Sequence, residues 1–423
     1  MMTTSSVYVH LQRPDNGEWV TVGRYTLNRP ETNNGIVAGS FKYAPSYLEA
    51  DHPWAIDPIN LGKLDTTPYA APRYNGLTDV LRDIAPDAWG KFLLQKEHNL
   101  SANAHEFEYL INSGNADRWG ALAIGLNKKP STSTIASPKM PKLADMVEEL
   151  QLMSSRQPAK HVELRKRLMK TLSSGGARPK ATVRDGNVFW LVKPTINTDT
   201  RNIALIEYAC MRMGSRATLN MAETALHQDH ARTAVLVKRF DRADDQRHMV
   251  LSGASILKTE YPAKLSVNQN NANWSYPLLA QSLRLIGVPD VDLMELFGRM
   301  LFNALIGNDD DHPRNHAIVW SQSEKKWRLS PAFDVVPNME ETPRNLSMQL
   351  SQGRWDISYD ALFYDWKYFG FANKAATHHY AKHLIAAIID SSNLLERDGL
   401  LAEDAELIRS RIQSVAHQLN PQA

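Results

Sequence analysis

The sequence predicts an α+β fold, with a mixed α/β N-terminal part and an all-helical C-terminal part that divide near residue 265. Apolar and polar residues alternate over Val7–Leu11 and Trp19–Tyr25, as in half-buried strands. Asp185-Gly186 stands between two apolar runs of 181–193, which favours a tight β-hairpin. After about residue 270 the apolar residues recur at spacings of three and four, the period of helices with one buried face.

Further elements of the N-terminal part follow from local composition. A Pro-studded stretch, 53–72, predicts irregular structure, and the next apolar pattern predicts a helix over Leu77–Leu94 that is interrupted at Pro86. Another apolar patch begins at Phe107–Ile111. Pro, Ser and Thr dominate Lys128–Lys142, which predicts an exposed loop or linker.

Two helices are expected after this linker. Leu143–Met153 is amphipathic, and His161–Leu172 is strongly basic. The basic face is either a solvated helix surface or an electrostatic contact for nucleic acid or an acidic partner. A helix over Ala204–Met213 and a strand over Ala234–Phe240 follow. The predicted domains are 1–142, 143–265 and 266–423, where the middle segment carries the expected hairpin and the strand over Ala234–Phe240, and the last segment is helical.

Composition excludes several classes of protein. The chain has 423 residues, of which 43% are hydrophobic and 22% charged, as in ordinary globular proteins. Its net charge of +2 does not indicate a strong polyelectrolyte partner. A single cysteine, Cys210, cannot form an internal disulfide or a Cys-based zinc site. Without a long apolar run or a signal-like N-terminus, we expect a cytoplasmic protein that does not contact a membrane.

The stretch GNDDDHPRNH, Gly307 to His316, crowds three aspartates after a long core helix. It suggests a solvated acidic turn, a metal cluster or the catalytic loop of a phosphoryl-transfer enzyme. Protein kinases place the base Asp and a metal-binding Asn five residues apart, and only Asp310 has this spacing to Asn315. A second metal-binding Asp should follow, and Asp334 in LSPAFDVVP is the candidate, after the hairpin-like runs 317–320 and 327–329.

A metal hydrolase is the competing interpretation of this stretch. The three carboxylates could ligate a transition metal together with His312 and His316. Pro313 follows His312 directly, which disfavours a helical pair of histidine ligands. No second cluster of similar density occurs in the sequence, so this interpretation is the weaker one.

A phosphate-binding segment precedes the acidic loop. SSGGARPKA, Ser173 to Ala181, is a Gly-containing turn whose exposed amides could form an anion nest. The following hairpin ends at Lys193, where a kinase places its strand lysine. The alternatives are a simple Ser/Gly turn and a solvent-facing lysine at a strand end. Glu207, on the next helix, either pairs with that lysine or is a surface glutamate.

Together these motifs resemble the HipA family of serine/threonine kinases, the toxins of bacterial type II toxin–antitoxin pairs. The resemblance covers nearly the whole chain and implies a two-lobed protein-kinase-like fold. It rests on ordered segments of the sequence: RYNGLTDVLRDIAPDAWGKFLL (73–94, with Ala85, Pro86, Asp87, Trp89 and Gly90 at the family's LPD-x-WG), DRWGALAIG (117–125), SSGGARPKA, LVK, LVKRFDR (236–242), GNDDDHPRN and LSPAFDVVP.

The resemblance also implies the cofactors ATP and Mg²⁺ and a set of site residues. Asp310 is the expected catalytic residue, and Asn315 and Asp334 are the expected Mg²⁺ ligands. HipA-like kinases are inactivated by phosphorylation in the Gly-rich loop, here at Ser173 or at the neighbouring Ser174. The expected ATP-binding residues are Ser174, Gly175, Gly176, Ala177, Lys193, Lys238, Phe240 and His312. Phe240 is expected to pack near the adenine, with backbone groups of Lys238 to Phe240 as the adenine hinge. Asp241 and Arg242, next to this hinge, could equally form a structural ion pair.

By the same resemblance the partners are a protein substrate and a HipB-like helix-turn-helix antitoxin, which carries the protein to operator DNA. An aminoacyl-tRNA synthetase is the substrate that the family suggests. The chain departs from the family at Asp309, Asp311, Arg314 and Leu251–Pro277, which leaves the substrate open. A small-molecule phosphotransferase and a catalytically silent corepressor are the alternative functions.

Overall fold

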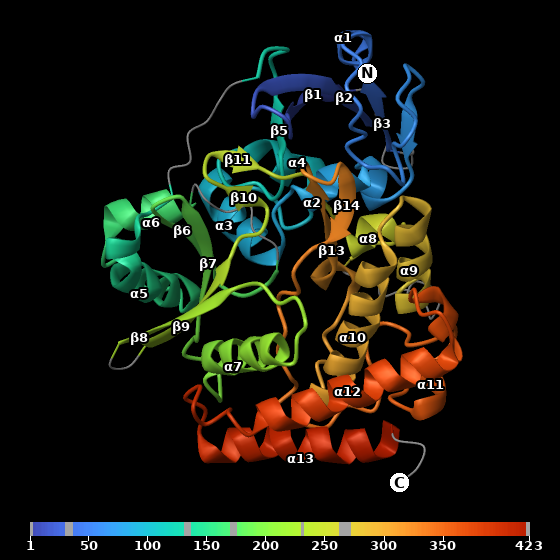
Figure 1. The fold of residues 1–423 in the computed structure, drawn as a ribbon. Coiled ribbons are helices and arrows are strands. Elements are labelled where there is room, and N and C mark those ends of the chain that lie inside the picture. The colour runs from blue at the N-terminus through green and yellow to red at the C-terminus, as the bar shows by residue number, and fades with distance from the viewer. Residues whose placement is uncertain are drawn as a thin grey trace. The chain divides into compact units, whose positions relative to one another are not determined.

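The structure, a computed structural model, describes residues 3–29, 37–130, 137–169, 176–229, 232–261 and 272–419 (Figure 1). Its fold is mixed α/β, as the sequence predicts. The chain forms two compact units. The first contains Met1–Pro194, Arg239–Leu251 and Val319–Glu324, and the second contains Thr195–Lys238, Ser252–Ile318 and Lys325–Ala423. The domain boundaries proposed from the sequence stay predictions.

A five-stranded antiparallel sheet opens the first unit, in the order β4-β3-β2-β1-β5. The two predicted strands are confirmed and are longer than expected. Val7 lies opposite Tyr25, and Leu27 lies opposite Gly39, so the apolar residues of neighbouring strands share one buried face. The strands are β1 (Thr3–Gln12), β2 (Trp19–Arg29), β3 (Ala38–Tyr43), β4 (Tyr69–Ala71) and β5 (Leu122–Gly125).

In the sequence, four helices of the same unit stand between the strands β3 and β5 of this sheet. The predicted interruption at Pro86 is confirmed, because α2 ends at Asp83 and α3 begins at Ala88, with Asp87 as its N-cap residue. Arg118 is fully buried and donates to the carbonyl oxygens of Ile84, Leu110 and Ser113 at 2.7–3.0 Å. The helices are α1 (Pro45–Glu49), α2 (Asp79–Asp83), α3 (Ala88–His98) and α4 (Glu106–Asn112), with 3₁₀ turns at Tyr74–Gly76 and Met140–Lys142.

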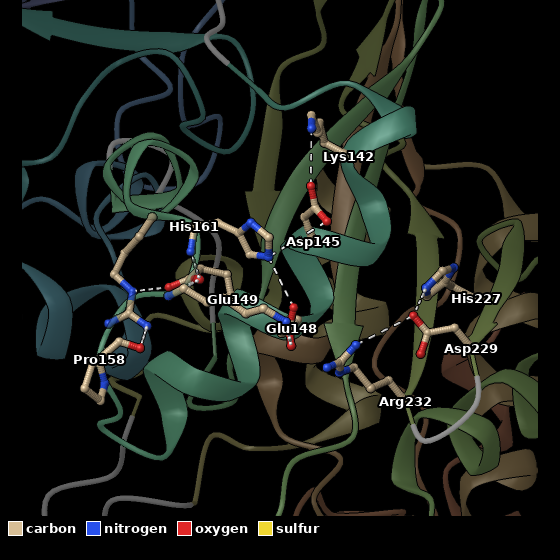
Figure 2. A network of polar contacts seen from close by, with 11 residues as sticks. Lys142, Asp145, Glu148, Glu149, Pro158, His161, His227, Asp229 and Arg232 are labelled. Atoms are coloured by element: carbon tan, nitrogen blue, oxygen red, sulfur yellow. Dashed lines mark hydrogen bonds and ion pairs between the residues drawn. The ribbon is translucent and has the colours of Figure 1, made fainter.

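The amphipathic and basic helices are α5 (Leu143–Ser154) and α6 (Val162–Met169). Figure 2 shows that Glu149 of α5 lies next to His161, the residue before α6, whose amide donates to the Glu149 carboxylate. The Glu149 side chain is fully buried and accepts from the amides of Lys160 (3.2 Å) and His161 (2.9 Å) and from Nε of Arg165. Part of the basic charge is therefore neutralised inside the unit; residues 170–172 of the predicted helix lie outside the described residues.

The predicted hairpin is β6 (Ala181–Asp185) and β7 (Val188–Pro194). Asp185 lies opposite Val188, which leaves a two-residue turn, and Gly186 has the positive φ (+56°) that such a turn requires. The first unit also contains the two-stranded ribbon β10 (Arg242–Ala243) and β11 (Gln246–Arg247). Strand β12 (Val250–Ser252) spans a division between the units.

The second unit begins with α7 (Ile203–Arg216) and the hairpin β8 (Thr224–Asp229) and β9 (Arg232–Lys238). The predicted strand corresponds to β9; β8 is an additional strand. From residue 272 on the chain is mainly helical, and the runs predicted as hairpin-like form β13 (Ala317–Ser321) and β14 (Lys326–Leu329). The helices after β9 are α8 (Gly253–Ile256), α9 (Tyr276–Leu285), α10 (Asp290–Ile306), α11 (Tyr359–Tyr364), α12 (Lys374–Ser392) and α13 (Ala402–Leu419), with 3₁₀ turns at Pro313–Asn315 and Trp366–Tyr368.

Helix α10 is the centre of the second unit. Its predicted apolar face is fully buried, and Phe297 packs edge-on against Phe369 and Phe371 at ring-centroid distances of 5.4 Å. Gly307 ends the helix in the left-handed conformation (φ +73°, ψ 43°), as predicted, and its amide donates to Asn303. None of the helices that the structure describes could cross a bilayer.

Candidate active site

The acidic loop starts at the left-handed turn of Gly307, directly after the buried helix α10. Its first residues are fixed by backbone bonds: the amide of Asn308 donates to the carbonyl of Asn303 (2.9 Å), and the amide of Asn338 donates to the carbonyl of Gly307 (2.8 Å). The loop that carries the three aspartates is therefore tied to the core at its origin.

The three aspartates have three different environments, which the sequence could not show. Asp311 is only 1% exposed and accepts from the Tyr276 hydroxyl and from Nε2 of His316 (2.7 Å). The interpretation of Asp311 as a solvated residue is therefore wrong, because it is a buried anchor of the loop. Asp309 is half-buried; its carboxylate accepts from Nδ2 of Asn338 (3.1 Å), and its carbonyl accepts from the Ser347 hydroxyl (2.5 Å).

Asp310 presents its carboxylate at the surface. No group in the described part of the chain donates a hydrogen bond to this carboxylate, whereas its backbone carbonyl accepts from Nδ2 of Asn315 (3.0 Å) and from the amide of His312 (2.9 Å). The loop removes part of the surrounding water and so raises the pKa of the Asp310 carboxyl; His312 opposes this rise, and the carboxylates of Asp334 and Asp309 add to it. The loop thus holds the backbone of Asp310 and leaves its side chain available.

Asn315 and Asp334 come together in the second unit, as their expected common role requires. Both line a small cavity of about 10 Å³, roughly the room of one water molecule, together with Asn308 and Asp311. Because Nδ2 of Asn315 is used by the carbonyl of Asp310, the Asn315 amide oxygen remains as a ligand atom. Asp334 has a positive φ (+59°), a conformation that residues other than glycine adopt rarely.

These groups fit a magnesium ion. Mg²⁺ takes oxygen ligands and keeps several waters, so one carboxylate and one amide oxygen beside nucleotide phosphates are an adequate protein contribution. The metal-hydrolase alternative lacks support, since the described residues contain no group of three or more His, Cys, Asp or Glu side chains that could hold a metal. In addition, His316 already binds Asp311.

His312 orders the loop from within. Its backbone carbonyl accepts from the amide of Asn315 (2.9 Å), and its buried ring lies against the ring of Tyr261, with 3.9 Å between the centroids. Burial lowers the pKa of the His312 imidazole, although the nearby carboxylates of Asp310 and Asp334 act in the opposite direction. A neutral, packed histidine is consistent with the predicted role in positioning the loop.

The predicted phosphate-binding segment lies in the first unit. Ser173, Ser174 and Gly175 are outside the described residues, whereas Gly176 and Ala177 are within them. Gly176 has a positive φ (+98°), its amide donates to Oδ2 of Asp87 (3.0 Å), and its carbonyl accepts from the amide of Trp89 (3.2 Å). The expectation of an exposed amide is therefore wrong for Gly176, because a carboxylate from another segment occupies it.

The sequence left open whether Lys193 and Glu207 are site residues or surface residues, and the structure shows that both are buried. Lys193, near the end of β7 in the first unit, is 8% exposed, so the alternative of a solvent-facing lysine is wrong. Glu207 of α7, in the second unit, is 3% exposed, which excludes a surface glutamate. Buried ionisable side chains are found where they have partners or a function.

The predicted adenine hinge, Lys238 to Phe240, has most of its amides in use. The amide of Lys238 donates to the carbonyl of Glu223, and the amide of Arg239 donates to the carbonyl of Phe189, each at 2.8 Å. Phe240 packs edge-on against Trp119, with 6.3 Å between the ring centroids. These two amides cannot donate to a nucleotide while the bonds persist, so Phe240 is the strongest of the predicted hinge residues.

The ion pair expected beside the hinge has a different partner. Asp241 binds Arg239 through two hydrogen bonds of 2.8 and 2.9 Å, whereas Nε of Arg242 lies 3.8 Å away. Burial acts against the charged carboxylate, but Arg239 outweighs it and holds the pKa of Asp241 well below its usual range. Asp241 is thus a structural residue.

Sequence patterns did not identify the residues that anchor the acidic loop. Nδ2 of Asn303 donates to the Tyr276 hydroxyl (3.1 Å), which in turn binds Asp311. Asn303 and Arg299 stand four apart within the buried part of α10, and such polar residues in an apolar pattern were the available signal. Tyr276 lies in α9, 35 residues before Asp311 in the sequence, and no sequence pattern indicated its contact with the loop.

The comparisons with known proteins identify the family of the chain. The profile of the HipA-like C-terminal domain matches residues 172–394. The chain is 28% identical over 139 residues to a Haemophilus influenzae protein described as "Putative kinase". This match covers 31% of the chain and 40% of the relative, so the chain spans less than half of that relative's length.

A solved structure shares the fold over nearly its full length. HipA of the Shewanella oneidensis toxin–antitoxin system, determined with HipB and its operator DNA, superposes with a TM-score of 0.67 at 16% sequence identity. The superposition covers 98% of this chain and 96% of that chain. Because the family profile takes in more than half of the sequence, the chain belongs to the HipA family.

Proposed function

We propose that this protein is an ATP-dependent kinase that phosphorylates a serine or threonine of a protein substrate. The observation that carries the proposal is the environment of the three aspartates. Asp309 and Asp311 are engaged by loop and core groups, and only Asp310 offers its carboxylate outward, beside Asn315 and Asp334. A catalytic loop requires this division, because one carboxylate must meet the substrate while its neighbours hold the backbone in place.

The roles follow from the chemistry of phosphoryl transfer. Asp310 orients the substrate hydroxyl and accepts its proton as the hydroxyl oxygen bonds to the γ-phosphorus and ADP leaves. Its pKa need not match that of a strong base, since positioning and charge supply most of the rate enhancement. Asn315 and Asp334 would hold Mg²⁺, which neutralises charge on the phosphates.

The nucleotide side of the proposal keeps the residues that the sequence predicts. Lys193 pairs with the phosphates, and Phe240 packs beside the adenine. His312 keeps the catalytic loop in place next to the nucleotide, and the remaining proposed ATP contacts are Ser174, Gly175, Gly176, Ala177 and Lys238. Self-inactivation by phosphorylation of Ser173 or Ser174 is part of the proposal and concerns residues outside the described ones.

The proposed partners come from the family. The Shewanella relative forms a complex with HipB and operator DNA. For this chain we infer a HipB-like antitoxin that neutralises it and carries it to DNA, in the cytoplasm, and a translation protein such as an aminoacyl-tRNA synthetase as substrate. The internal pairing of His161 with Glu148 and of Arg165 with Glu149 supports DNA contact mainly through the antitoxin.

One experiment separates the possible functions. The purified protein is incubated with Mg²⁺, γ-labelled ATP and a bacterial lysate. A labelled protein band that is lost in Asp310→Asn but kept in Asp309→Asn supports the proposal. A labelled small metabolite identifies a phosphotransferase instead, and no transfer by the wild-type protein identifies a catalytically silent corepressor. If only Asp309→Asn loses transfer, Asp310 is not the catalytic residue, and the assignment made here is wrong.

A further inference from the structure

Asp87 lies far from the catalytic loop in sequence, at the N-terminus of α3, yet it contacts the proposed nucleotide-binding segment. Its Oδ2 accepts from the amide of Gly176 (3.0 Å). Two residues later, the amide of Trp89 donates to the carbonyl of Gly176 (3.2 Å). Both backbone groups of Gly176 are therefore held by the 87–89 segment, and we call this pair of bonds the Gly176 clamp.

The carboxylate of Asp87 is itself fixed from the other side. Its Oδ1 accepts from Nη2 of Arg82 (2.5 Å), a guanidinium of α2 that is only 2% exposed. Arg82 also lies 3.2 Å from the Glu106 carboxylate of α4, which in turn binds Lys91. A chain of ion pairs from α2, α3 and α4 thus leads through Asp87 to one glycine, and each charged group has an opposite partner, as burial requires.

Gly176 needs this support because of its backbone. Its φ of +98° lies in a region that residues with a Cβ atom rarely adopt. A Cβ atom at this position would also lie 2.3 Å from Nζ of Lys180. Glycine has the largest conformational entropy to lose on ordering, so an unsupported glycine samples many conformations. Two bonds to its amide and carbonyl select one of them.

We propose that Asp87 is a positioning residue for nucleotide binding, which fixes Gly176 and so orders the end of the Gly-rich segment for the ATP phosphates. This inference rests on the proposed function. Asp87 does not touch the nucleotide; it acts through the Gly176 amide. Preorganisation of this kind raises affinity because less ordering remains to be done when the ligand binds.

The test measures the binding of Mg²⁺ with a non-hydrolysable ATP analogue by calorimetry. We expect Asp87→Ala to bind about tenfold more weakly, which is ~1.4 kcal/mol. Asp87→Asn keeps an oxygen acceptor for the Gly176 amide and should recover much of the affinity, with a loss of about threefold. Hydrogen exchange at the peptide that contains Gly176 should become faster in Asp87→Ala.

Asp79 supplies the matched control. It lies on the same stretch of chain, is 2% exposed against 5% for Asp87, and forms two hydrogen bonds with Arg73 (2.6 and 2.7 Å). Asp79→Ala should lose stability but keep nucleotide affinity and slow exchange at Gly176.

The possible results all decide the question. Equal loss of affinity in Asp79→Ala and Asp87→Ala would mean that general destabilisation causes the effect, and tighter binding by Asp87→Ala would mean that the carboxylate competes with phosphate; either result overturns the inference. Unchanged affinity in both Asp87 variants overturns it while the proposed function stands. A wild-type protein that binds no ATP overturns both. If Asp87→Ala does not fold, the comparison of Asp87→Asn with Asp79→Asn decides in the same way.

Discussion

Replacing Asp311 tests whether this buried aspartate is a structural residue that holds the acidic loop next to the proposed catalytic Asp310. Asp311→Ala removes the acceptor for two buried donors, the Tyr276 hydroxyl and Nε2 of His316. Nδ1 of His316 has no hydrogen-bond partner among the described residues, so the substitution leaves this ring without any bond there. The side chain itself is 1% exposed, and water cannot replace the lost acceptor easily.

The magnitude follows from these contacts. A buried donor that loses its partner costs ~1–3 kcal/mol, and two such donors give ~2–6 kcal/mol. For a folded unit of this size ~4 kcal/mol corresponds to a fall in melting temperature of roughly 8–16 °C. Asp311→Asn keeps one oxygen acceptor, so it should lose about half as much.

The assay is thermal unfolding followed by circular dichroism and by intrinsic fluorescence. Asp309→Ala is the control, since that carboxylate is half-buried and accepts one bond, from Asn338; its loss should cost ~1 kcal/mol. A melting temperature of Asp311→Ala within about 2 °C of the control would contradict the reasoning. It would show that the buried network does not hold the loop, and the assignment of Asp311 as an anchor would fail.

Three more predictions use the proposed site. Asp310→Asn should melt at a higher temperature than the wild type at pH 7: the native pKa is raised, so ionisation costs native stability as the pH rises from about 3.9 through the native pKa, and melting curves that do not converge at acidic pH would argue against this origin. Lys193→Met should weaken ATP binding while its apolar stem preserves the packing of β7, which is 8% exposed at this residue; unchanged affinity by calorimetry would remove Lys193 from the site. Long incubation with Mg-ATP should add phosphate at Ser173 or Ser174, with about −1.5 to −2 charge and a loss of ATP affinity; mass spectrometry that finds phosphate only elsewhere, or calorimetry that finds full affinity, would exclude this switch.

The elements with strong local patterns were predictable. The face of α10, the left-handed Gly307 and the β6–β7 turn follow from spacing and from the conformations that glycine allows. Strand β3 was missed because Ala-Gly-Ser-Phe-Lys-Tyr contains few residues that favour strands, and it forms through pairing with β2. Propensity decides little where a neighbouring strand supplies the hydrogen bonds.

The site was predictable in its residue types and not in its contacts. The D-x4-N spacing selects Asp310 over its neighbours, but it cannot say that Asp311 is buried against Tyr276, a residue 35 positions away. Likewise, the sequence shows Asp87 and Gly176 as parts of separate motifs, and only the fold brings their atoms within 3.0 Å. Burial and long-range hydrogen bonds depend on tertiary packing, which local patterns do not encode.

The interleaving of the two units has a consequence for how the protein is made. The first unit takes its last segment, Val319–Glu324, from a part of the chain that follows most of the second unit in sequence. On the ribosome the chain emerges from its N-terminus, so the first unit cannot be completed until Glu324 has left the exit tunnel. A nascent chain that ends at Pro194 already contains the five strands of the sheet but lacks Arg239 and Asp241, the buried pair that binds Asp117 and Gly120. Synthesis must therefore run past the acidic loop, Gly307 to His316, before the first unit, which carries the proposed nucleotide contacts Lys193 and Phe240, can be completed.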